Sequence, residues 1–290
     1  LTGASGWFGR TALWEFEQLF GAEALRAQVV PLASEAKLIH FGSSHGPVRA
    51  LPLAQLSQVE NPGGLLHLAF LTRERVASEG LESYIHKNRA ITSAVAAFLQ
   101  QHPTIPIITT SSGAAAALDV CPPDLARDPY ATLKQEEERL WLHNAAHRMA
   151  VVFRVYAASG RFLKDPAIFA LGDFIRQAQA GQPVLIRSTR PVIRSYVPVG
   201  TLMRLAWLML RNPLPIGYRQ VDAVTHTLSL LELATLISQH WGLPAPQSSI
   251  DPSLAADSYA ADPTAFAALL AQYNIAVPTM LEQILDTAAV

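Results

Sequence analysis

The sequence predicts an α/β fold in which a doubly wound parallel sheet is followed by a smaller C-terminal lobe. A glycine-rich segment opens the chain just before a helical stretch, and short apolar runs then alternate with segments of helical length. After about residue 160 the alternation loosens, and prolines and helices dominate. Strands that alternate with helices are typical of a parallel sheet covered on both faces. We therefore expect domains at 1–160 and 161–290, the second partly interleaved with the last strands of the first.

The first expected elements follow the glycine-rich segment in order. Segment 10–20 predicts a helix, and the apolar run 28–33 predicts a buried strand, although Pro31 disfavours a central strand. Runs 48–53 and 64–69 predict two further strands. The chain starts at the end of what should be the first strand, so a few strand residues are expected upstream.

The next elements continue the alternation. Leu81–Gln101 predicts a helix, because apolar residues recur at helical spacing and the segment ends before Pro103. The β-branched run 105–110 predicts a strand, 129–148 a helix, and 151–154 a short buried strand. The acidic run Glu136, Glu137 and Glu138 is most simply a solvated face of the helix at 129–148. The helices expected in the C-terminal lobe are 168–180, 201–210, 228–241 and 278–287.

Composition limits the class of protein. The 290 residues suffice for one or two domains with a large core. With 22 basic and 23 acidic residues the chain is nearly neutral, so we expect neither nucleic acid nor a membrane surface as partner. Segment 201–210 is the longest apolar run, but it is too short to span a bilayer and contains Arg204. The single cysteine, Cys121, excludes an internal disulfide and indicates a reducing, cytoplasmic location.

The opening segment has glycines at the spacing of a dinucleotide-binding loop. Gly3 permits a tight turn out of a strand, Gly6 lets the backbone approach a pyrophosphate, and Gly9 allows close helix–strand packing. The helix N-terminus that follows offers free N–H groups and a positive dipole end to the phosphates. The cofactor-binding candidates of this segment are Gly3, Ser5, Gly6, Trp7, Phe8 and Gly9.

With its later motifs, the chain resembles the short-chain dehydrogenase/reductase superfamily, and more narrowly the extended branch, the NAD-dependent epimerase/dehydratase family. The further markers are His67-Leu68-Ala69, Asn88, Ser111-Ser112, Tyr130 with Lys134, and the segments 192–197 and 227–234. The resemblance covers nearly the whole chain. It implies a Rossmann-type first domain, a C-terminal substrate-binding lobe, a nicotinamide cofactor touching Leu68 and Ala69, and a small-molecule substrate, mostly a nucleotide sugar in this family. It also implies a homodimer formed through Leu81–Gln101 and 129–148.

The resemblance assigns the catalytic residues. Hydride transfer at a C–OH group requires a proton to leave or reach that oxygen, and a free tyrosine with pKa about 10 is a poor base at neutral pH. Lys134 lies one helical turn after Tyr130 and favours tyrosinate electrostatically. Tyr130 is therefore the expected acid/base, and Lys134 the residue that lowers its pKa and holds the nicotinamide ribose. Ser112 is expected to bond the reacting oxygen and Ser111 to support the cofactor.

Two departures from the family pattern concern the ligands. Where the family usually has an acidic residue for the adenosine ribose, Leu32 is followed by Ala33 and Ser34. Without that carboxylate a 2′-phosphate is not repelled, and Ser34, Lys37 and Arg10 could bind it. NAD or NADP is therefore expected, with a slight preference for NADP and Ser34 as a ligand. On the substrate side the family residues are replaced at 155–157 and 197–201, which leaves Arg194 as the phosphate or carboxylate clamp.

The residues after Ser112 narrow the reaction. Gly113 and Ala114 replace the Asp-Glu pair that sugar dehydratases use to eliminate water, so epimerase or reductase chemistry is expected. Two alternatives stay open: a reductase of a non-nucleotide carbonyl compound, and a non-catalytic NAD(P)-binding regulatory protein. No metal site is expected, since His143 and His147 lack a third ligand at suitable spacing.

Overall fold

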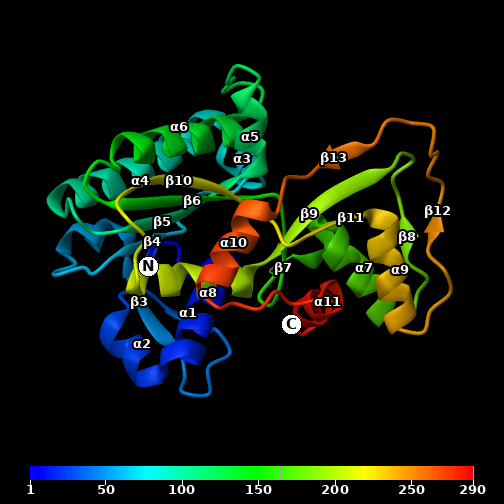
Figure 1. Cartoon of the computed structure of the whole chain (residues 1–290), viewed down its shortest axis with the longest axis horizontal. Helices are drawn as coiled ribbons and strands as arrows, with labels where there is room; N and C mark the ends of the chain where they lie inside the picture. Colours follow the sequence, from blue (N-terminus) through cyan, green and yellow to red (C-terminus); the bar gives the residue numbers. More distant parts are fainter. Residues whose placement is uncertain (164, 290) are drawn as a thin grey trace. The chain divides into compact units, whose positions relative to one another are not determined.

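The computed structural model describes residues 1–163 and 165–289 and divides into two compact units (Figure 1). The first unit comprises Leu1–Arg154 and Met203–Val221, and the second comprises Val155–Leu202 and Asp222–Val290. The sequence placed a boundary at residue 160 with partial interleaving. The structure places it after Arg154 and returns one later segment, which contains most of a helix and a strand, to the first unit.

The first unit is built on a largely parallel sheet. Its strands are β1 (Leu32–Ala33), β2 (Lys37–Ile39), β3 (Val48–Pro52), β4 (Leu65–His67), β5 (Ile107–Ser112), β6 (Met149–Val155) and β10 (Gly217–Ala223). One path runs β1-β3-β2 and another β10-β6-β5-β4. Thr2 joins the two paths through parallel bridges to Leu32 and His67. The pairs β1–β3 and β4–β5 are parallel, so the carboxyl ends of these strands share edges.

Helices cover both faces of this sheet. They are α1 (Trp7–Phe20), α2 (Ala22–Gln28), α3 (Arg75–Glu79), α4 (Leu81–Gln101), α5 (Gly113–Ala116), α6 (Pro129–His143) and α8 (Val199–Arg211), with 3-10 turns at Leu53–Gln58 and Ala117–Asp119. In Figure 1, α4 and α6 lie on one face, while α1 and α8 lie on the other. Trp207 of α8 donates its indole N–H to the Ala12 carbonyl of α1 at 2.7 Å, which ties these two helices together.

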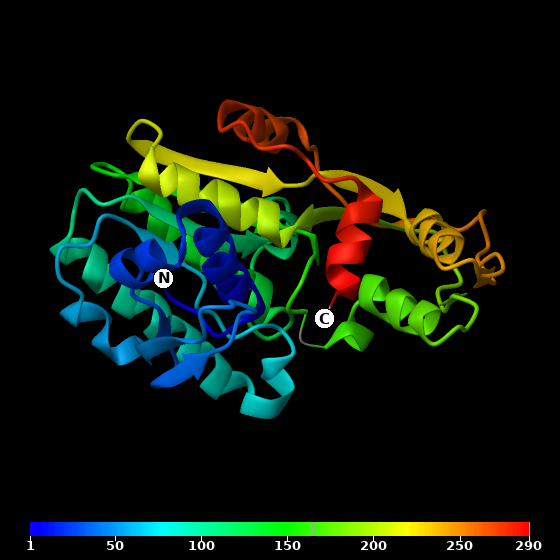
Figure 2. The same ribbon diagram turned by 90° about the horizontal axis from the view of Figure 1, so that it is seen from below.

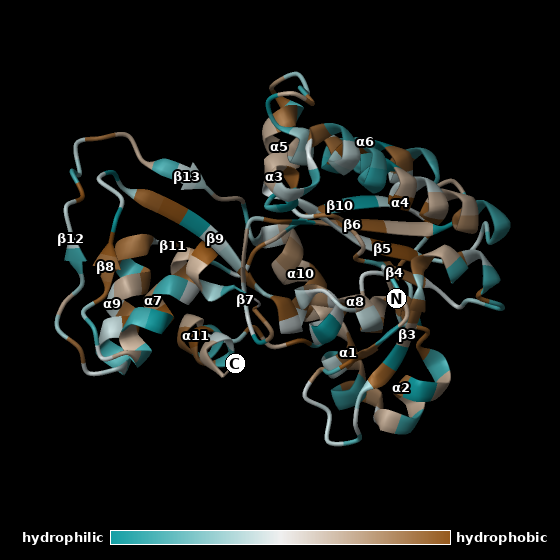
Figure 3. Ribbon diagram, turned by 180° about the vertical axis from the view of Figure 1, so that it is seen from behind, coloured by the Kyte–Doolittle hydropathy of each residue, from teal (hydrophilic) through white to brown (hydrophobic). Residues whose placement is uncertain are grey.

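The core of the first unit lies between the sheet and α4 and α6. Leu65, Ile107 and Val152 of three neighbouring strands pack with Phe98 and Trp141, all of them buried. The same strands are coloured mainly as hydrophobic in Figure 3. Burial of each such side chain contributes about 1.5–3 kcal/mol, so this layer holds α6 firmly on the sheet.

The second unit has its own sheet and helices. Its strands are β7 (Ala157–Ser159), β8 (Leu185–Ile186), β9 (Val192–Pro198), β11 (His226–Ser229), β12 (Gln247–Ser248) and β13 (Asp257–Tyr259). Its helices are α7 (Ala170–Gln179), α9 (Leu230–His240), α10 (Thr264–Gln272) and α11 (Met280–Ala288), with a 3-10 turn at Pro166–Ile168. β9 pairs with β7 and β13 in parallel and with β11 antiparallel. Phe174, Leu233 and Ile284 form part of its core, and α7 lies beside α11 (Figure 2).

Three expectations about elements were wrong. The run 28–33 is not one strand, because α2 continues to Gln28 and only Leu32–Ala33 pair with a neighbour. Residues 22–28 consist of good helix formers, and Pro31 follows them. The helix at 129–148 ends at His143, where the Asn144 side chain donates to the Leu140 carbonyl at 2.8 Å.

The third wrong expectation concerns the acidic run on α6, residues 136–138. Glu137 and Glu138 are 2% and 4% exposed, so this run is not a solvated face, and only Glu136 fits that description. The helix turns these two residues toward the strands because its buried side faces β4, β5 and β6. No helix among the described residues has the length and apolar character needed to cross a membrane.

Candidate active site

The glycine segment forms a tight loop pressed against the end of β4. Gly3 has φ 69°, and a Cβ built on it would lie 2.5 Å from the Leu68 carbonyl carbon. A Cβ on Gly9 would lie 2.2 Å from the Gly3 carbonyl oxygen. Only glycine fits both positions, because the obstructing atoms belong to the backbone. Gly9 thus permits α1 to begin directly against the loop, rather than against a strand as the spacing suggested.

The N-terminus of α1 fits the phosphates of a dinucleotide. Gly6 occupies the N-cap, where it has no side chain that could accept from the first amides, and the first turn lacks an acidic residue. Gly6 is exposed, and Ser5, Trp7 and Phe8 are partly exposed. Backbone N–H groups and the positive end of a 14-residue helix suit an anion here. The residues present therefore fit a nicotinamide dinucleotide.

The two serines lie at the carboxyl end of β5. Ser111 is 6% exposed, and its hydroxyl has no hydrogen-bond partner among the described residues. Ser112 accepts a hydrogen bond from the Ala114 N–H at 3.2 Å and so caps α5. A buried hydroxyl without a protein partner is uncommon, so the Ser111 side chain suits a ligand at this edge of the sheet.

Tyr130 lies in the first turn of α6, which begins after Asp128. The Asp128 carboxylate accepts from the Ala131 N–H at 3.0 Å, and Pro129 occupies the first helical position. The Tyr130 ring contacts Phe70 edge-on, with centroids 5.8 Å apart, and the Arg73 guanidinium lies 5.2 Å from its centroid. Burial raises the pKa of Tyr130, and hydrogen bonding with Ser112 offsets only part of this rise.

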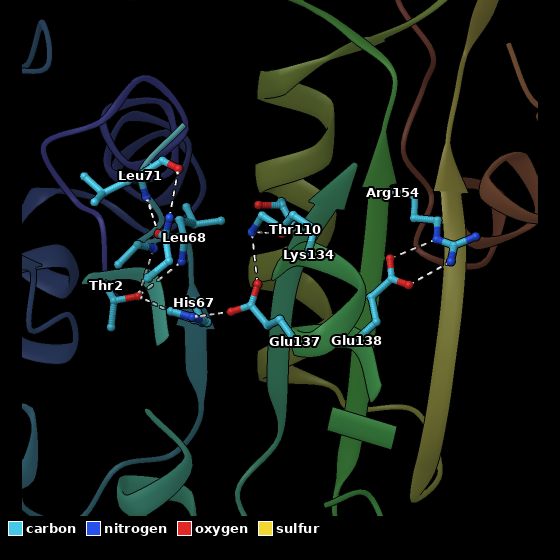
Figure 4. Close-up of polar contacts among 11 residues, drawn as sticks. Thr2, His67, Leu68, Leu71, Thr110, Lys134, Glu137, Glu138 and Arg154 are labelled. Carbon is cyan, nitrogen blue, oxygen red and sulfur yellow. Dashed lines mark hydrogen bonds and ion pairs between the residues drawn. The ribbon is translucent and has the colours of Figure 1, made fainter. Parts of the chain in front are cut away.

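Lys134 is held one turn further along α6. Its ammonium donates to the Thr110 carbonyl at 2.9 Å and to the Glu137 carboxylate at 3.0 Å, and it lies 3.7 Å from the centre of the Phe70 ring. Thr110 precedes the serines on β5, so the structure brings Ser112, Tyr130 and Lys134 together. Figure 4 shows Lys134 between Thr110 and Glu137.

Glu137 is a member of this site that was not predicted from the sequence. Its carboxylate is buried and joins Lys134 to His67 Nε2, which lies 2.9 Å away. Burial alone would raise the pKa of Glu137, but the charge of Lys134 and the hydrogen bond with His67 outweigh it and lower the pKa to about 2. The available signal was its position three residues after Lys134, which places both side chains on one helix face.

Thr2 connects this cluster to the loop after β4. Its hydroxyl accepts from the N–H groups of Leu68 and Ala69 at 3.2 and 3.3 Å and lies 2.7 Å from His67 Nδ1. Leu68 and Ala69, both predicted cofactor neighbours, therefore share a hydrogen-bond network with the predicted catalytic lysine. His67, expected to be structural or near the ribose, is a buried member of that network.

A second buried charge pair anchors α6 to β6. The Arg154 guanidinium donates to both oxygens of Glu138, at 2.9 and 2.7 Å, and to both oxygens of Asp119. Arg154 and Glu138 are almost fully buried. These bonds raise the pKa of Arg154 against the opposing effect of burial, so the guanidinium stays charged.

The residues near the end of β1 have partners within the protein. Ser34 is exposed just after the strand, and Lys37 pairs with Glu35 at 2.8 Å. Arg10 donates its Nε–H to the His40 carbonyl at 2.9 Å. The cationic groups considered for a 2′-phosphate are thus engaged locally.

Arg194, the predicted substrate clamp, belongs to the second unit. It lies on β9, and its guanidinium donates to the carbonyl and the carboxylate of Asp257, both at 2.8 Å. The positive charge of the Arg194 guanidinium is therefore compensated by one carboxylate within its own unit.

The other candidate residues form no further site. No group of side chains that could hold a metal ion occurs among the described residues, and Cys121 is an exposed, free cysteine.

Most of the chain matches the model of a known protein family. The family model described as "NAD dependent epimerase/dehydratase family" matches residues 1–219. The chain therefore belongs to the NAD-dependent epimerase/dehydratase family and is an enzyme of the extended short-chain dehydrogenase/reductase type, as its motifs predict. The comparison with curated proteins gave no match.

Solved structures confirm the predicted Rossmann-type α/β fold. MoeE5 in complex with UDP-glucuronic acid and NAD is 20% identical with a TM-score of 0.73, over 99% of this chain and 96% of that one. UDP-glucuronic acid 4-epimerase from Bacillus cereus is 16% identical, with a TM-score of 0.71 over 99% and 96%. UDP-N-acetylglucosamine 4-epimerase from Methanobrevibacter ruminantium M1 is 18% identical, with a TM-score of 0.71 over 99% and 95%. At these identities the likeness establishes the fold.

Proposed function

We propose that this protein is an NAD-dependent epimerase that acts by hydride transfer at a carbinol carbon of a nucleotide sugar. The observation that carries the proposal is the convergence of Ser112, Tyr130 and Lys134 where β5 ends and α6 begins. Similar structures that contain UDP-sugars and NAD support the choice of ligands.

The roles of the residues follow from their positions. Tyr130 removes the proton from the substrate hydroxyl as hydride departs, and it returns the proton to the same oxygen as hydride is delivered to the opposite face of the carbon. Ser112 hydrogen-bonds the same oxygen and keeps it within reach of the phenol. Lys134 supplies positive charge beside the site and binds the ribose of the cofactor. The bound nicotinamide supplies the hydride acceptor and donor, so the reaction has no net redox change.

The surroundings of Ser112 favour epimerisation over dehydration. Gly113 and Ala114 begin α5 and carry no acid or base that could eliminate water. Elimination at a neighbouring carbon needs a proton donor and an acceptor of its own. A simple reduction would use the same three residues, and it is distinguished from epimerisation by consumption of the reduced cofactor.

For the cofactor, the local ion pairing favours NAD over the NADP preference expected from the sequence. Glu35 compensates Lys37, and the Arg10 Nε–H is bound to a carbonyl, so each of these cations would have to exchange a partner to bind a 2′-phosphate. Ser34 can instead bond a ribose hydroxyl. Calorimetric titration with both dinucleotides tests this assignment, and tighter binding of NADP would overturn it.

The proposal is tested with Tyr130→Phe and Ser112→Ala against a panel of UDP- and dTDP-sugars. We expect Tyr130→Phe to retain cofactor binding and to lose about 10²–10⁴-fold in kcat, because the acid/base hydroxyl is removed. Turnover that survives Tyr130→Phe would refute the assigned role. Turnover restricted to carbonyl compounds without a nucleotide would favour a reductase, and cofactor binding without turnover would favour a regulatory protein.

Two further assignments complete the proposal. Arg194 is proposed to exchange Asp257 for a substrate phosphate, so Arg194→Ala should raise KM more than it lowers kcat. A homodimer is proposed through α4 and α6, between which a groove of about 250 Å³ includes Phe70, Thr92 and Leu140. Sedimentation that shows only monomer would reject this assembly. The lone exposed Cys121 is consistent with a cytoplasmic location.

A further inference from the structure

We propose that Glu137 is a positioning residue of the active site, which fixes the Lys134 ammonium and links it to the loop after β4. This inference rests on the proposed function, because it assigns Glu137 a task in cofactor binding and in tyrosine acid/base chemistry.

The geometry is a continuous chain of buried side chains across three elements. Lys134 Nζ lies 3.0 Å from Glu137 Oε2, Glu137 Oε1 lies 2.9 Å from His67 Nε2, and His67 Nδ1 lies 2.7 Å from Thr2 Oγ1. The Glu137 side chain is 2% exposed, that of His67 1%, and that of Lys134 7%. Figure 4 shows the carboxylate between the lysine and the imidazole.

The hydrogen bonds at Thr2 determine which ring nitrogen of His67 accepts and which one donates. Its oxygen already accepts from the N–H groups of Leu68 and Ala69, so its own hydrogen is directed to His67 Nδ1. His67 Nδ1 then accepts, and Nε2 carries the proton that is donated to Glu137. Glu137 is an ionised carboxylate with a donor on each oxygen.

This arrangement controls the charge that Tyr130 experiences. The groups that face Tyr130 are Arg73 and Glu74 after β4, Tyr84 on α4, and Glu137 on its own helix, together with the Ser112 hydroxyl of β5. The negative charge of Glu137 raises the pKa of Tyr130, and it also compensates the positive charge of the Lys134 ammonium. Its carboxylate thus holds the lysine in place, while its negative charge opposes ionisation of the tyrosine.

A glutamine cannot replace this carboxylate without loss. Its amide nitrogen would face either the Lys134 ammonium or the His67 Nε2–H, and both of these are donors. Glu137→Gln therefore keeps the size of the side chain but removes one acceptor and the charge. Glu137→Asp keeps the charge but is too short by one methylene to reach both partners. The matched control is Glu136→Gln, which changes the neighbouring, partly exposed carboxylate that pairs with Arg89.

The experiment measures three properties of the full chain for wild type and the three variants. They are the NAD dissociation constant by calorimetry, the pH dependence of kcat, and the melting temperature, which reports folding. For Glu137→Gln we expect NAD binding weaker by about tenfold, since a hydrogen bond that orders a charged group is lost. We also expect the acid limb of the kcat profile at lower pH, since Tyr130 loses a nearby negative charge. Glu137→Asp should weaken binding but leave the acid limb in place, and Glu136→Gln should change neither.

The outcomes separate this inference from the proposed function. Unchanged NAD binding and an unchanged pH profile in a folded Glu137→Gln variant would overturn the positioning role. An acid limb that moves equally in Glu137→Asp would also overturn it, because that variant retains the charge. If wild type binds NAD but turns over no substrate, the proposed function fails, and the binding comparison still tests Glu137. Should Glu137→Gln fail to fold, the binding and pH profile of Glu137→Asp decide the matter.

Discussion

Replacing Arg154 with methionine should destabilise the first unit strongly. Arg154 on β6 donates to both oxygens of Glu138 on α6, and each side chain is 5% exposed. The substitution keeps a long apolar stem but leaves the Glu138 carboxylate buried without the guanidinium that compensates it. The second partner, Asp119, is half exposed and can return to water, so it adds little to the loss.

The expected loss follows from the burial of the pair. Removing one partner of a buried ion pair costs about 3–5 kcal/mol, because an uncompensated charge is left in a region of low polarity. For a unit of this size each kcal/mol lowers the melting temperature by about 2–4 °C, so we expect a fall of roughly 6–20 °C. Replacing both partners together, as Glu138→Leu with Arg154→Met, should recover most of the loss, since no buried charge remains.

Urea unfolding and thermal melting at pH 7 check this prediction. Arg139→Met serves as the control, because Arg139 lies on the exposed side of the same helix. This prediction is wrong if Arg154→Met costs less than about 1 kcal/mol, the value typical of exposed pairs. It is also refuted if the double variant loses as much as both single variants combined, since the two effects would then be independent.

Three further predictions follow from single features. Gly9→Ala places a Cβ 2.2 Å from the Gly3 carbonyl oxygen, so it should weaken NAD binding more than about tenfold in calorimetry. The control is Gly63→Ala, whose Cβ meets no atom within 4 Å and which should leave NAD binding unchanged. The pKa of Glu137 is lowered from 4.5 to about 2, so its stabilisation is present above pH 4.5 and is lost as pH falls. At about 1.4 kcal/mol per pH unit, the advantage of wild type over Glu137→Gln in unfolding free energy should shrink by about 2 kcal/mol between pH 4.5 and 3; a constant difference would contradict this. Burial lowers the pKa of His226, so the unfolded state binds a proton at a higher pH than the folded state does. As the pH is lowered through 6.5, the melting temperature of wild type should therefore fall. It should fall less in His226→Gln, whereas the control His240→Gln should behave as wild type does.

The bounds of a helix or strand were predicted well where nearby residues determine them. Leu81–Gln101 has the predicted bounds because its apolar period is regular and Pro103 follows closely. Strand β5 was found within two residues of its predicted bounds, because its β-branched run leads into Ser111, Ser112 and Gly113. The prediction failed at Gln28, where a helix and a strand adjoin without a strong boundary signal.

The candidate site was only half predictable, for a physical reason. Tyr130 and Lys134 are related by helical spacing, and Ser112 follows a recognisable strand, so the sequence contains their relationship. The contact of Glu137 with His67 joins residues 70 positions apart, and it depends on how α6 is rotated on the sheet. Three consecutive glutamates do not by themselves show which of them face the sheet, and the spacing from Lys134 to Glu137 was not used, so two buried carboxylates were assigned to solvent.

The buried charged residues of α6 fix the rotation of this helix on the sheet. The helix crosses three strands and is tied to each by a polar contact: Glu137 to His67 of β4, Lys134 to the Thr110 carbonyl of β5, and Glu138 to Arg154 of β6 (Figure 4). Apolar residues at these positions would pack at least as stably, but they would tolerate a small turn or slide of the helix. A turn of α6 by one residue would instead leave a buried charge without its partner, which is costly. Because Tyr130 lies on the same rigid helix, these contacts also fix its phenol beside Ser112, where acid/base chemistry requires it.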